Sequence, residues 1–185
     1  HISVLTKLDA VHSLQFGNAD QIAHEELKLQ HNTLLHCYIN NGEEKGMALA
    51  PKLRTKYTIY DTIGQQADIT SSDYTITQND DPSLSSPILT HSLLHYSQKT
   101  TSFTTTIVGK IHHDYVALAY DILERVRNQY NLQSIQPLET LPLTLQPGRM
   151  SLFHGKQDSI IVDSSYNSSP LSVRKVIEES LVIQQ

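Results

Sequence analysis

The chain has 185 residues, a formal net charge of −5 and 38% hydrophobic residues, which predicts one domain, or one and a half, able to bury most of its apolar surface. Its mild acidity and scattered Lys and Arg argue against nucleic-acid binding. No apolar run approaches the roughly 18 residues of a membrane span, and the first residues do not read as a signal peptide. The single cysteine, Cys37, cannot form an internal disulfide, which agrees with the reducing cytoplasm where we expect the protein.

The first predicted elements alternate between strand and helix. A short β-branched run at 2–6 predicts a strand that begins almost at the first residue, so we expect that upstream sequence is missing. Residues 20–31 predict a helix with Asp20 as its N-cap. A second strand is predicted at 34–39, and it ends in the turn residues Asn40–Gly42.

From Lys56 to Val108 the pattern changes. Short runs rich in Thr, Tyr and Ile alternate with polar breaks that contain Gly, Asp, Ser and Pro. This alternation is typical of an antiparallel sheet with exposed edges and not of parallel βαβ units. The runs lie at 56–60, 73–77, 88–96 and 101–108.

Two amphipathic helices are predicted in the remainder of the chain. The first spans 112–130 and the second 172–183, and a strand at 159–163 lies between them after a proline-punctuated connection at 137–147. The helical spacing predicts that these residues face inward: Val116, Ala119, Tyr120, Leu123 and Val126 in the first helix, and Val173, Val176, Ile177 and Leu181 in the second.

The most informative motif is Pro147-Gly148-Arg149, followed by a short apolar strand and then by Asp163-Ser-Ser-Tyr-Asn-Ser-Ser-Pro170. The two stretches at this spacing resemble the hinge between the central and C-terminal domains of the Mur ligases, which build the peptide of peptidoglycan. The branch of the family that adds D-alanyl-D-alanine carries P-G-R and then D-D-S-Y-N-A-N-P. A lone P-G-R or Y-N would mean little, but two further matches lie upstream in the family's order.

The resemblance implies nucleotide-binding roles for residues of this hinge. Arg149 falls on the family's arginine, which approaches the phosphates or the ribose, and a planar, permanently charged guanidinium suits that contact. Asp163, Tyr166 and Asn167 match the second motif, whereas Ser164 replaces the aspartate that contacts the nucleotide in the family. The structural alternatives are a hinge salt bridge for Arg149 and a simple polar turn between strand and helix for the second motif.

The segment from Thr6 to Asn18 resembles a Mur strand that runs into a loop with a histidine and then F-G-S. His12 falls on that histidine, which helps to bind the second magnesium ion of the active site. In the next helix the family has a carbamylated lysine that binds magnesium, and setting Phe16-Gly17 on the family's F-G places Glu26 there. A glutamate still offers the oxygen ligand that magnesium prefers. The alternatives are a loop histidine without a ligand and an ordinary solvated helix charge.

Gly109 to Ala119 resembles the family's G-x-H-N-x-x-N-A-L-A-A, in which the first Asn contacts the adenine. Anchoring on Ala117-Leu118-Ala119 places His113 on that Asn and requires one extra residue after Gly109. An imidazole can hydrogen-bond a purine edge. Without the resemblance, two histidines at the start of a helix are more often surface caps than binding residues.

A P-loop of the G-x-x-G-K-T kind, whose backbone N–H groups cradle the phosphates of ATP, does not occur in the sequence. Gly109-Lys110 and Gly155-Lys156 lack the glycine-rich lead and the following Ser or Thr. We therefore expect these 185 residues alone to be inactive, and we expect their partner to be a P-loop segment missing from the N-terminal side of the same protein.

The resemblance implies an α/β fold in two parts. Residues 1–146 correspond to the C-terminal part of a central ATPase domain with an appended antiparallel sheet, and 147–185 to the hinge and the first strand and helix of a Rossmann-like domain. The implied activity uses ATP and magnesium to add D-alanyl-D-alanine to a UDP-muramyl-peptide through an acyl phosphate, in peptidoglycan synthesis for the cell wall. The alternatives are a ligase like folylpolyglutamate synthase, and a non-catalytic Mur-like binding protein or split-gene subunit.

Overall fold

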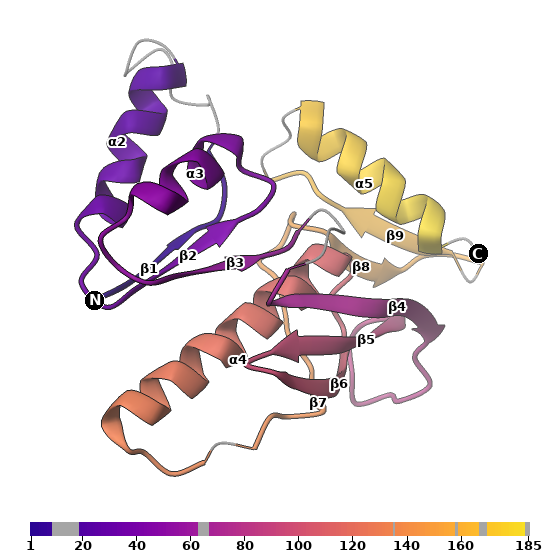
Figure 1. The fold of residues 1–185 in the computed structure, drawn as a ribbon. Helices are drawn as coiled ribbons and strands as arrows, with labels where there is room; N and C mark the ends of the chain where they lie inside the picture. The colour runs from indigo at the N-terminus through magenta and orange to yellow at the C-terminus, as the bar shows by residue number, and fades with distance from the viewer. Residues whose placement is uncertain (9–18, 63–66, 135, 158, 167–169, 184–185) are drawn as a thin grey trace. The chain divides into compact units, whose positions relative to one another are not determined.

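The computed structural model describes residues 1–8, 19–62, 67–134, 136–157, 159–166 and 170–183 (Figure 1). The chain divides into two units. The first comprises His1–Thr70 together with Tyr96–Gln98, and the second comprises Ser71–His95 and Lys99–Gln185. None of the helices in the described ranges combines the length and apolar character that a membrane crossing needs.

The first unit contains a parallel sheet of three strands in the order β1-β2-β3. The strands are β1 (Ile2–Leu5), β2 (His36–Asn40) and β3 (Tyr57–Tyr60), and β2 is buried along its whole length. Burial on both faces is typical of the central strand of a parallel sheet. The strands predicted at 2–6 and 34–39 are confirmed.

The prediction that 56–60 belongs to the antiparallel sheet is wrong. Cys37, Tyr38 and Ile39 of β2 pair in parallel with consecutive residues of β3, beginning at Tyr57. The short run in β3 has the composition of a strand, but its sequence does not say which strand it will pair with, because that depends on residues 20 positions away. The composition therefore predicted the element and not its sheet.

Two helices and a short 3-10 turn connect the parallel strands. They are α2 (Ala19–His31), α3 (Glu44–Leu49) and η2 (Ala50–Lys52). α2 confirms the helix predicted at 20–31. The core of this unit contains Leu5, Ile39 and Ala50, and partly buried apolar side chains pack against it: Leu8, Leu27, Met47 and Leu53.

The second unit contains a four-stranded sheet in the order β4-β5-β6-β7 (Figure 1). The strands are β4 (Thr70–Gln78), β5 (Ile88–Tyr96), β6 (Lys99–Thr105) and β7 (Thr140–Leu141), and β7 pairs in parallel with β6. Ser97 and Gln98 join β5 to β6 with φ values of 46° and 60°, as in the two-residue turns of antiparallel hairpins.

Side-chain hydrogen bonds across this sheet confirm the antiparallel arrangement predicted for β4, β5 and β6. Along each pair of neighbouring strands, the residue numbers rise in one strand while those of their hydrogen-bond partners fall in the other. The pairs are Ser72–His95 and Thr77–His91 between β4 and β5, and His95–Thr100 and His91–Thr104 between β5 and β6.

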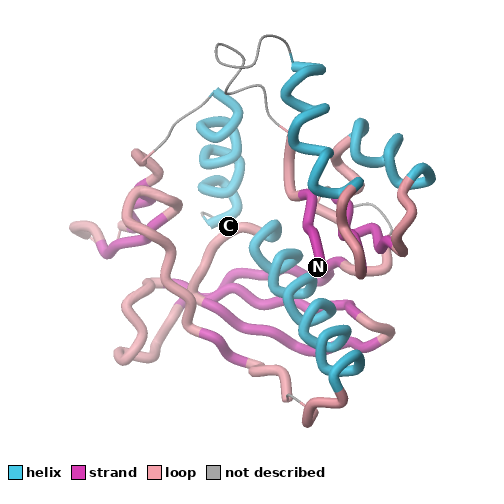
Figure 2. The backbone as a smooth tube through the Cα atoms, turned by 90° about the vertical axis from the view of Figure 1, so that its left-hand side faces the viewer, coloured by secondary structure: helices cyan, strands magenta, loops and turns pink. Residues whose placement is uncertain are grey.

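The helix α4 (Lys110–Tyr130) confirms the helix predicted at 112–130, and it lies along one face of the sheet (Figure 2). Its predicted buried face is wrong. Leu123 is 42% exposed, and the buried residues of α4 are His113, Asp114, Ala117, Leu118, Asp121 and Glu124.

The polar side chains on the buried face of α4 have hydrogen-bond or ion-pair partners, and this pairing allows the face to be buried. Asp114 accepts hydrogen bonds from the backbone N–H and hydroxyl of Ser71, at 2.7 and 2.6 Å, and from Lys110 at 2.9 Å. Glu124 pairs with Lys99 and Arg127. Apolar periodicity does not reveal such a face, because its polar side chains are paired with Ser71 and Lys99 of the sheet and with residues of α4 itself.

The C-terminal segment contains an antiparallel pair, β8 (Ser151–His154) and β9 (Ile160–Asp163), and the helix α5 (Pro170–Ile183). The strand at 159–163 and the helix at 172–183 are confirmed, whereas β8 was not predicted. The predicted inward face of α5 is wrong: Val173 is 44% exposed, and Ile177 and Leu181 are both 57% exposed. The two-stranded sheet of β8 and β9 has too little surface to cover the apolar stripe of α5, so these side chains stay exposed.

Candidate functional site

The carboxyl ends of β1, β2 and β3 are held together by one side chain, that of Asn40. Its Nδ2 donates to the carbonyl of Thr6 at 2.7 Å. Its Oδ1 accepts from the backbone N–H of Gly42 at 2.9 Å and from the hydroxyl of Thr62 at 2.8 Å. Since Thr6, Gly42 and Thr62 each follow a different strand, Asn40 links the three segments at the edge where open α/β sheets bind ligands.

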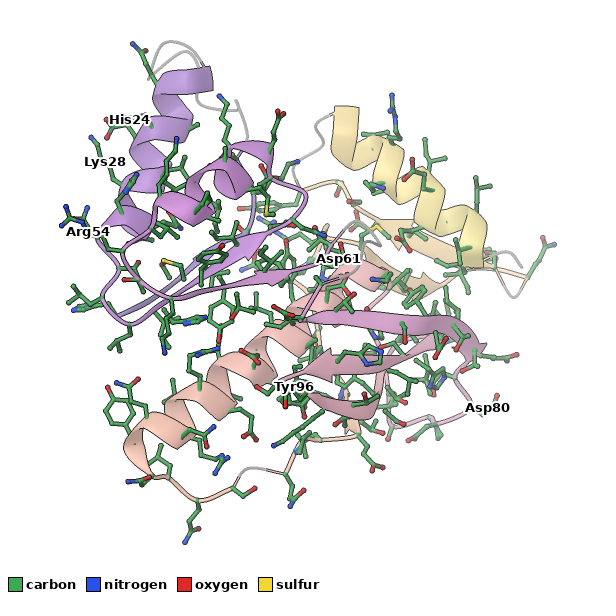
Figure 3. The ribbon with its side chains drawn as sticks, viewed as in Figure 1. His24, Lys28, Arg54, Asp61, Asp80 and Tyr96 are labelled. Carbon is green, nitrogen blue, oxygen red and sulfur yellow. The ribbon has the colours of Figure 1, made fainter. Side chains whose placement is uncertain are left out.

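Two further polar residues lie at this edge. Asp61, which directly follows β3, is fully buried, and its backbone N–H donates to the carbonyl of Ile69 at 2.9 Å (Figure 3). Asn41 follows β2, and its backbone N–H donates to the carbonyl of Tyr60 at 3.0 Å. Sequence reasoning assigned Asn40 and Asn41 only to a turn. Asn40 is the last residue of buried β2 and Asn41 directly follows it, and two polar residues at the end of such a strand were the signal that could have placed them at a site.

Magnesium binding by His12 and Glu26 remains a prediction. His12 lies outside the described residues, and Glu26 lies in α2 but its side chain is not among those described. Its neighbour Glu25 is exposed and pairs with Lys28 at 2.6 Å, and this hydrogen bond lowers the pKa of the Glu25 carboxyl. Within the described ranges, no three His, Cys, Asp or Glu side chains gather in a way that could hold a metal ion.

His113 lies in the core of the second unit. It is fully buried, its Nε2 is hydrogen-bonded to the hydroxyl of Thr90 at 2.9 Å, and its Nδ1 to the hydroxyl of Ser92 at 2.6 Å. The rings of Tyr74 and Phe103 contact it edge-on. Burial lowers the pKa of His113 to about 4, so the ring is neutral at pH 7. A purine contact by His113 would therefore require these two hydrogen bonds to break.

The hinge motif forms a tight turn. The backbone N–H of Arg149 donates to the carbonyl of Gln146 at 3.1 Å, and Gly148 has a φ of 78°. Pro147 followed by a glycine with positive φ is the combination that a type II turn requires. A Cβ on Gly148 would lie 2.8 Å from the backbone nitrogen of Tyr166. Only glycine therefore fits where the two motifs meet.

The pairing of β8 with β9 explains why the two motifs meet. Ser151 lies opposite Asp163, so the turn before β8 and the segment after β9 are neighbours. The Arg149 guanidinium carbon lies 4.6 Å from the centre of the Tyr166 ring, and the N–H of Tyr166 donates to the carbonyl of Gly148 at 3.0 Å.

The two motifs place a permanent positive charge beside an aromatic ring. Arg149 is exposed, and Tyr166 is 63% exposed. Asp163 orders the start of the next segment, because its Oδ1 accepts from the N–H of Ser165 at 3.0 Å. The structure thus brings together Arg149, Asp163, Ser164 and Tyr166, while Asn167 lies outside the described residues. An accessible guanidinium and an aromatic face are groups that can contact a phosphate and a base.

Comparisons with known proteins place this geometry in a known fold. No family model matches the sequence, and no curated protein matches it significantly. Solved structures of Mur ligases nevertheless match almost the whole chain. The MurF ligase of Thermotoga maritima, solved in complex with ADP, matches with a TM-score of 0.69 and 15% identity over 97% of this chain and 39% of its own.

Two other Mur ligase structures give the same result. MurF of Acinetobacter baumannii matches with a TM-score of 0.61 and 16% identity over 96% of this chain and 37% of its own. A UDP-N-acetylmuramoyl-L-alanyl-D-glutamate–2,6-diaminopimelate ligase matches with a TM-score of 0.55 and 17% identity over 96% of this chain and 35% of its own. The chain therefore has the fold of a part of the Mur ligases, and it spans less than two fifths of their length.

Proposed function

We propose that this chain is part of an ATP-dependent ligase of the Mur type, which joins an amine to the carboxylate of a UDP-muramyl-peptide during peptidoglycan precursor synthesis in the cytoplasm. The observation that supports the proposal best is the contact between the Pro147–Arg149 turn and the Asp163–Tyr166 segment, within a fold that matches Mur ligases along 97% of the chain. The amine is D-alanyl-D-alanine, as the resemblance of the second motif suggests.

The reaction has two steps. The substrate carboxylate takes the γ-phosphoryl group of ATP to form an acyl phosphate and ADP, and the amine then attacks the acyl carbon and releases phosphate. Arg149 binds the nucleotide through its phosphates or ribose, and Tyr166 holds the guanidinium plane by stacking under it. Magnesium, held by His12 and Glu26, would supply positive charge that offsets the charge of the phosphates.

These 185 residues need a phosphate-binding loop from elsewhere, since their sequence contains no P-loop. The partner is a P-loop segment of the same protein, or a second polypeptide if the gene is split. Without it, the isolated chain should show no ATP hydrolysis and only weak nucleotide binding, which calorimetric titration with ATP and magnesium measures. A micromolar dissociation constant, equivalent to about −8 kcal/mol, would mean that the nucleotide site is elsewhere.

A second candidate function is a non-catalytic Mur-like binding protein. Ser164 and Glu26 replace two family residues, and the imidazole of His113 is committed to the core. These departures would be unremarkable in a protein that no longer hydrolyses ATP. A ligase like folylpolyglutamate synthase remains the alternative enzyme, and it would differ in its acceptor substrate.

The deciding experiment uses the longest natural polypeptide that contains these residues. Release of ADP should depend on both UDP-muramyl-tripeptide and D-alanyl-D-alanine, and mass spectrometry should detect the amide product. Arg149→Ala should lower turnover at least tenfold, whereas Arg54→Ala, an exposed arginine distant in sequence from the hinge, serves as the control. ADP release with a folate and glutamate instead would favour the alternative ligase, and no release with either pair would favour the binding protein.

A further inference from the structure

The amino-terminal edge of the parallel sheet exposes a group of large apolar side chains. Leu34 and Leu35 precede β2, Tyr57 begins β3, and Leu29 lies in the last turn of α2. Leu34 is 71% exposed, Leu29 62%, Tyr57 41% and Leu35 40%. Because the strands are parallel, this edge lies at the opposite end of β2 from Asn40. Grouped apolar side chains on a surface indicate an interaction, whereas single ones need no explanation.

A basic segment lies beside these leucines. The hydroxyl of Thr55 donates to the carbonyl of Thr33 at 2.6 Å, and Thr33 directly precedes the two leucines. Thr55 lies between Arg54 and Lys56, so this hydrogen bond sets two cations next to the apolar side chains. Both cations are exposed, and Figure 3 shows Arg54 directed outward from the first unit.

The charge at this edge differs from that of the whole chain. The chain has a net charge of −5, but residues 27–35 and 50–60 contain four Lys or Arg and no Asp or Glu. One of the four, Lys28, pairs with Glu25 at 2.6 Å. The other three are exposed and belong to no ion pair within the described part of the chain: Lys52, Arg54 and Lys56.

We propose that this edge docks the protein on the surface of an anionic lipid bilayer. Exposed leucines enter the boundary between headgroups and acyl chains, while the long side chains of Lys and Arg keep their charges at the headgroups. Tyrosine is enriched at this boundary because its ring is apolar and its hydroxyl is polar. An acidic protein would match the three cations alone. A bilayer also accommodates Leu34, the most exposed large apolar side chain of the described residues.

The first test measures how the longest natural polypeptide that contains these residues co-sediments with lipid vesicles. Vesicles of phosphatidylglycerol and phosphatidylcholine in equal parts should bind it, and added salt should weaken the binding. Vesicles of phosphatidylcholine alone should bind it at least about tenfold more weakly, because each cation near an anionic surface contributes about a fivefold factor. Arg54→Ala and Lys56→Ala should therefore each weaken the binding about fivefold, and Leu34→Ser about tenfold.

Lys156→Ala and Leu132→Ser are the matched controls, since they remove an exposed cation and an exposed leucine from the second unit. Both should bind the vesicles as tightly as the unaltered protein. All the replaced side chains are exposed, so the melting temperatures should change little. The proposal is overturned if the anionic vesicles do not bind, if the variants at the edge bind normally, or if the controls lose as much binding. Binding to polyglutamate without binding to vesicles would overturn it in favour of an acidic protein.

The second test observes insertion in the 185-residue chain, which contains no tryptophan. Leu34→Trp places a single fluorophore before β2, and Leu132→Trp places one at a position that is 54% exposed in the second unit. Anionic vesicles should shift the Leu34→Trp emission to shorter wavelength, and brominated lipids should quench it, whereas Leu132→Trp should not respond. Equal responses, or none from Leu34→Trp, would refute the docking. Because the docking does not depend on the proposed reaction, a ligase assay that fails while this emission shifts would refute the reaction alone.

Discussion

The buried His113 should make the stability of this protein depend on pH. Burial lowers its pKa from the ordinary value of 6.5 to about 4, with smaller contributions from the charges of His112, Lys110 and His91. The folded chain therefore keeps the ring neutral at pH values at which the unfolded chain protonates it. This contribution is fully present above pH 6.5, and it is lost as the pH falls towards about 4.

The size of the effect follows from the same shift. Each pKa unit corresponds to 1.36 kcal/mol, so a shift from 6.5 to about 4 corresponds to about 3 kcal/mol of unfolding free energy. For a domain of this size, 3 kcal/mol is a large share of the total stability. His113 is fully buried, so solvent screening does not reduce this contribution as it would at the surface.

Urea unfolding followed by far-ultraviolet circular dichroism, repeated between pH 7.5 and 4.5, measures this contribution. His113→Gln keeps a neutral donor and acceptor near Thr90 and Ser92, so it should lose stability at pH 7.5 but show a flatter decline on acidification. The control is His91→Gln, because His91 also lies between two hydroxyls but is only half-buried. Equal slopes for the unaltered chain and His113→Gln would refute the reasoning.

Three further predictions concern other parts of the chain. Asp114→Ala should lower the unfolding free energy by roughly 2 kcal/mol in urea titrations, since it leaves the buried Ser71 donors and Lys110 without their acceptor; no change would mean that water replaces the carboxylate. Gly148→Ala should destabilise the hinge turn by about 1–3 kcal/mol, because Gly148 has a φ of 78° and a Cβ there would press on the Tyr166 nitrogen. Hydrogen exchange at the Tyr166 amide should therefore accelerate. Ile177→Lys should change the stability of the isolated chain by less than about 0.5 kcal/mol, because Ile177 is 57% exposed; a larger loss in thermal unfolding would show that the residue is buried in solution.

The sequence alone predicted the elements whose signals are local. A β-branched run predicted β1, and a run of mainly apolar residues that ends in turn residues predicted β2. The alternating Thr-rich runs predicted most of the antiparallel sheet, and helical spacing predicted α2, α4 and α5. The hinge turn was also predictable as a motif, since Pro147 and Gly148 carry their backbone preferences within two residues. Each of these signals lies inside a stretch of a few residues, which is why one sequence was enough to read it.

The tertiary structure decided which elements and faces meet. β3 joined the parallel sheet because β2 offered it a partner, and α4 buried Asp114 while leaving Leu123 exposed because Ser71 supplied hydrogen bonds. The site at the carboxyl edge depends on the same non-local choices. Asn40 looks like an ordinary turn residue until three parallel strands bring Thr6 and Thr62 beside it. Pairing between distant segments is set by the free energy of the whole fold, and no local pattern encodes it.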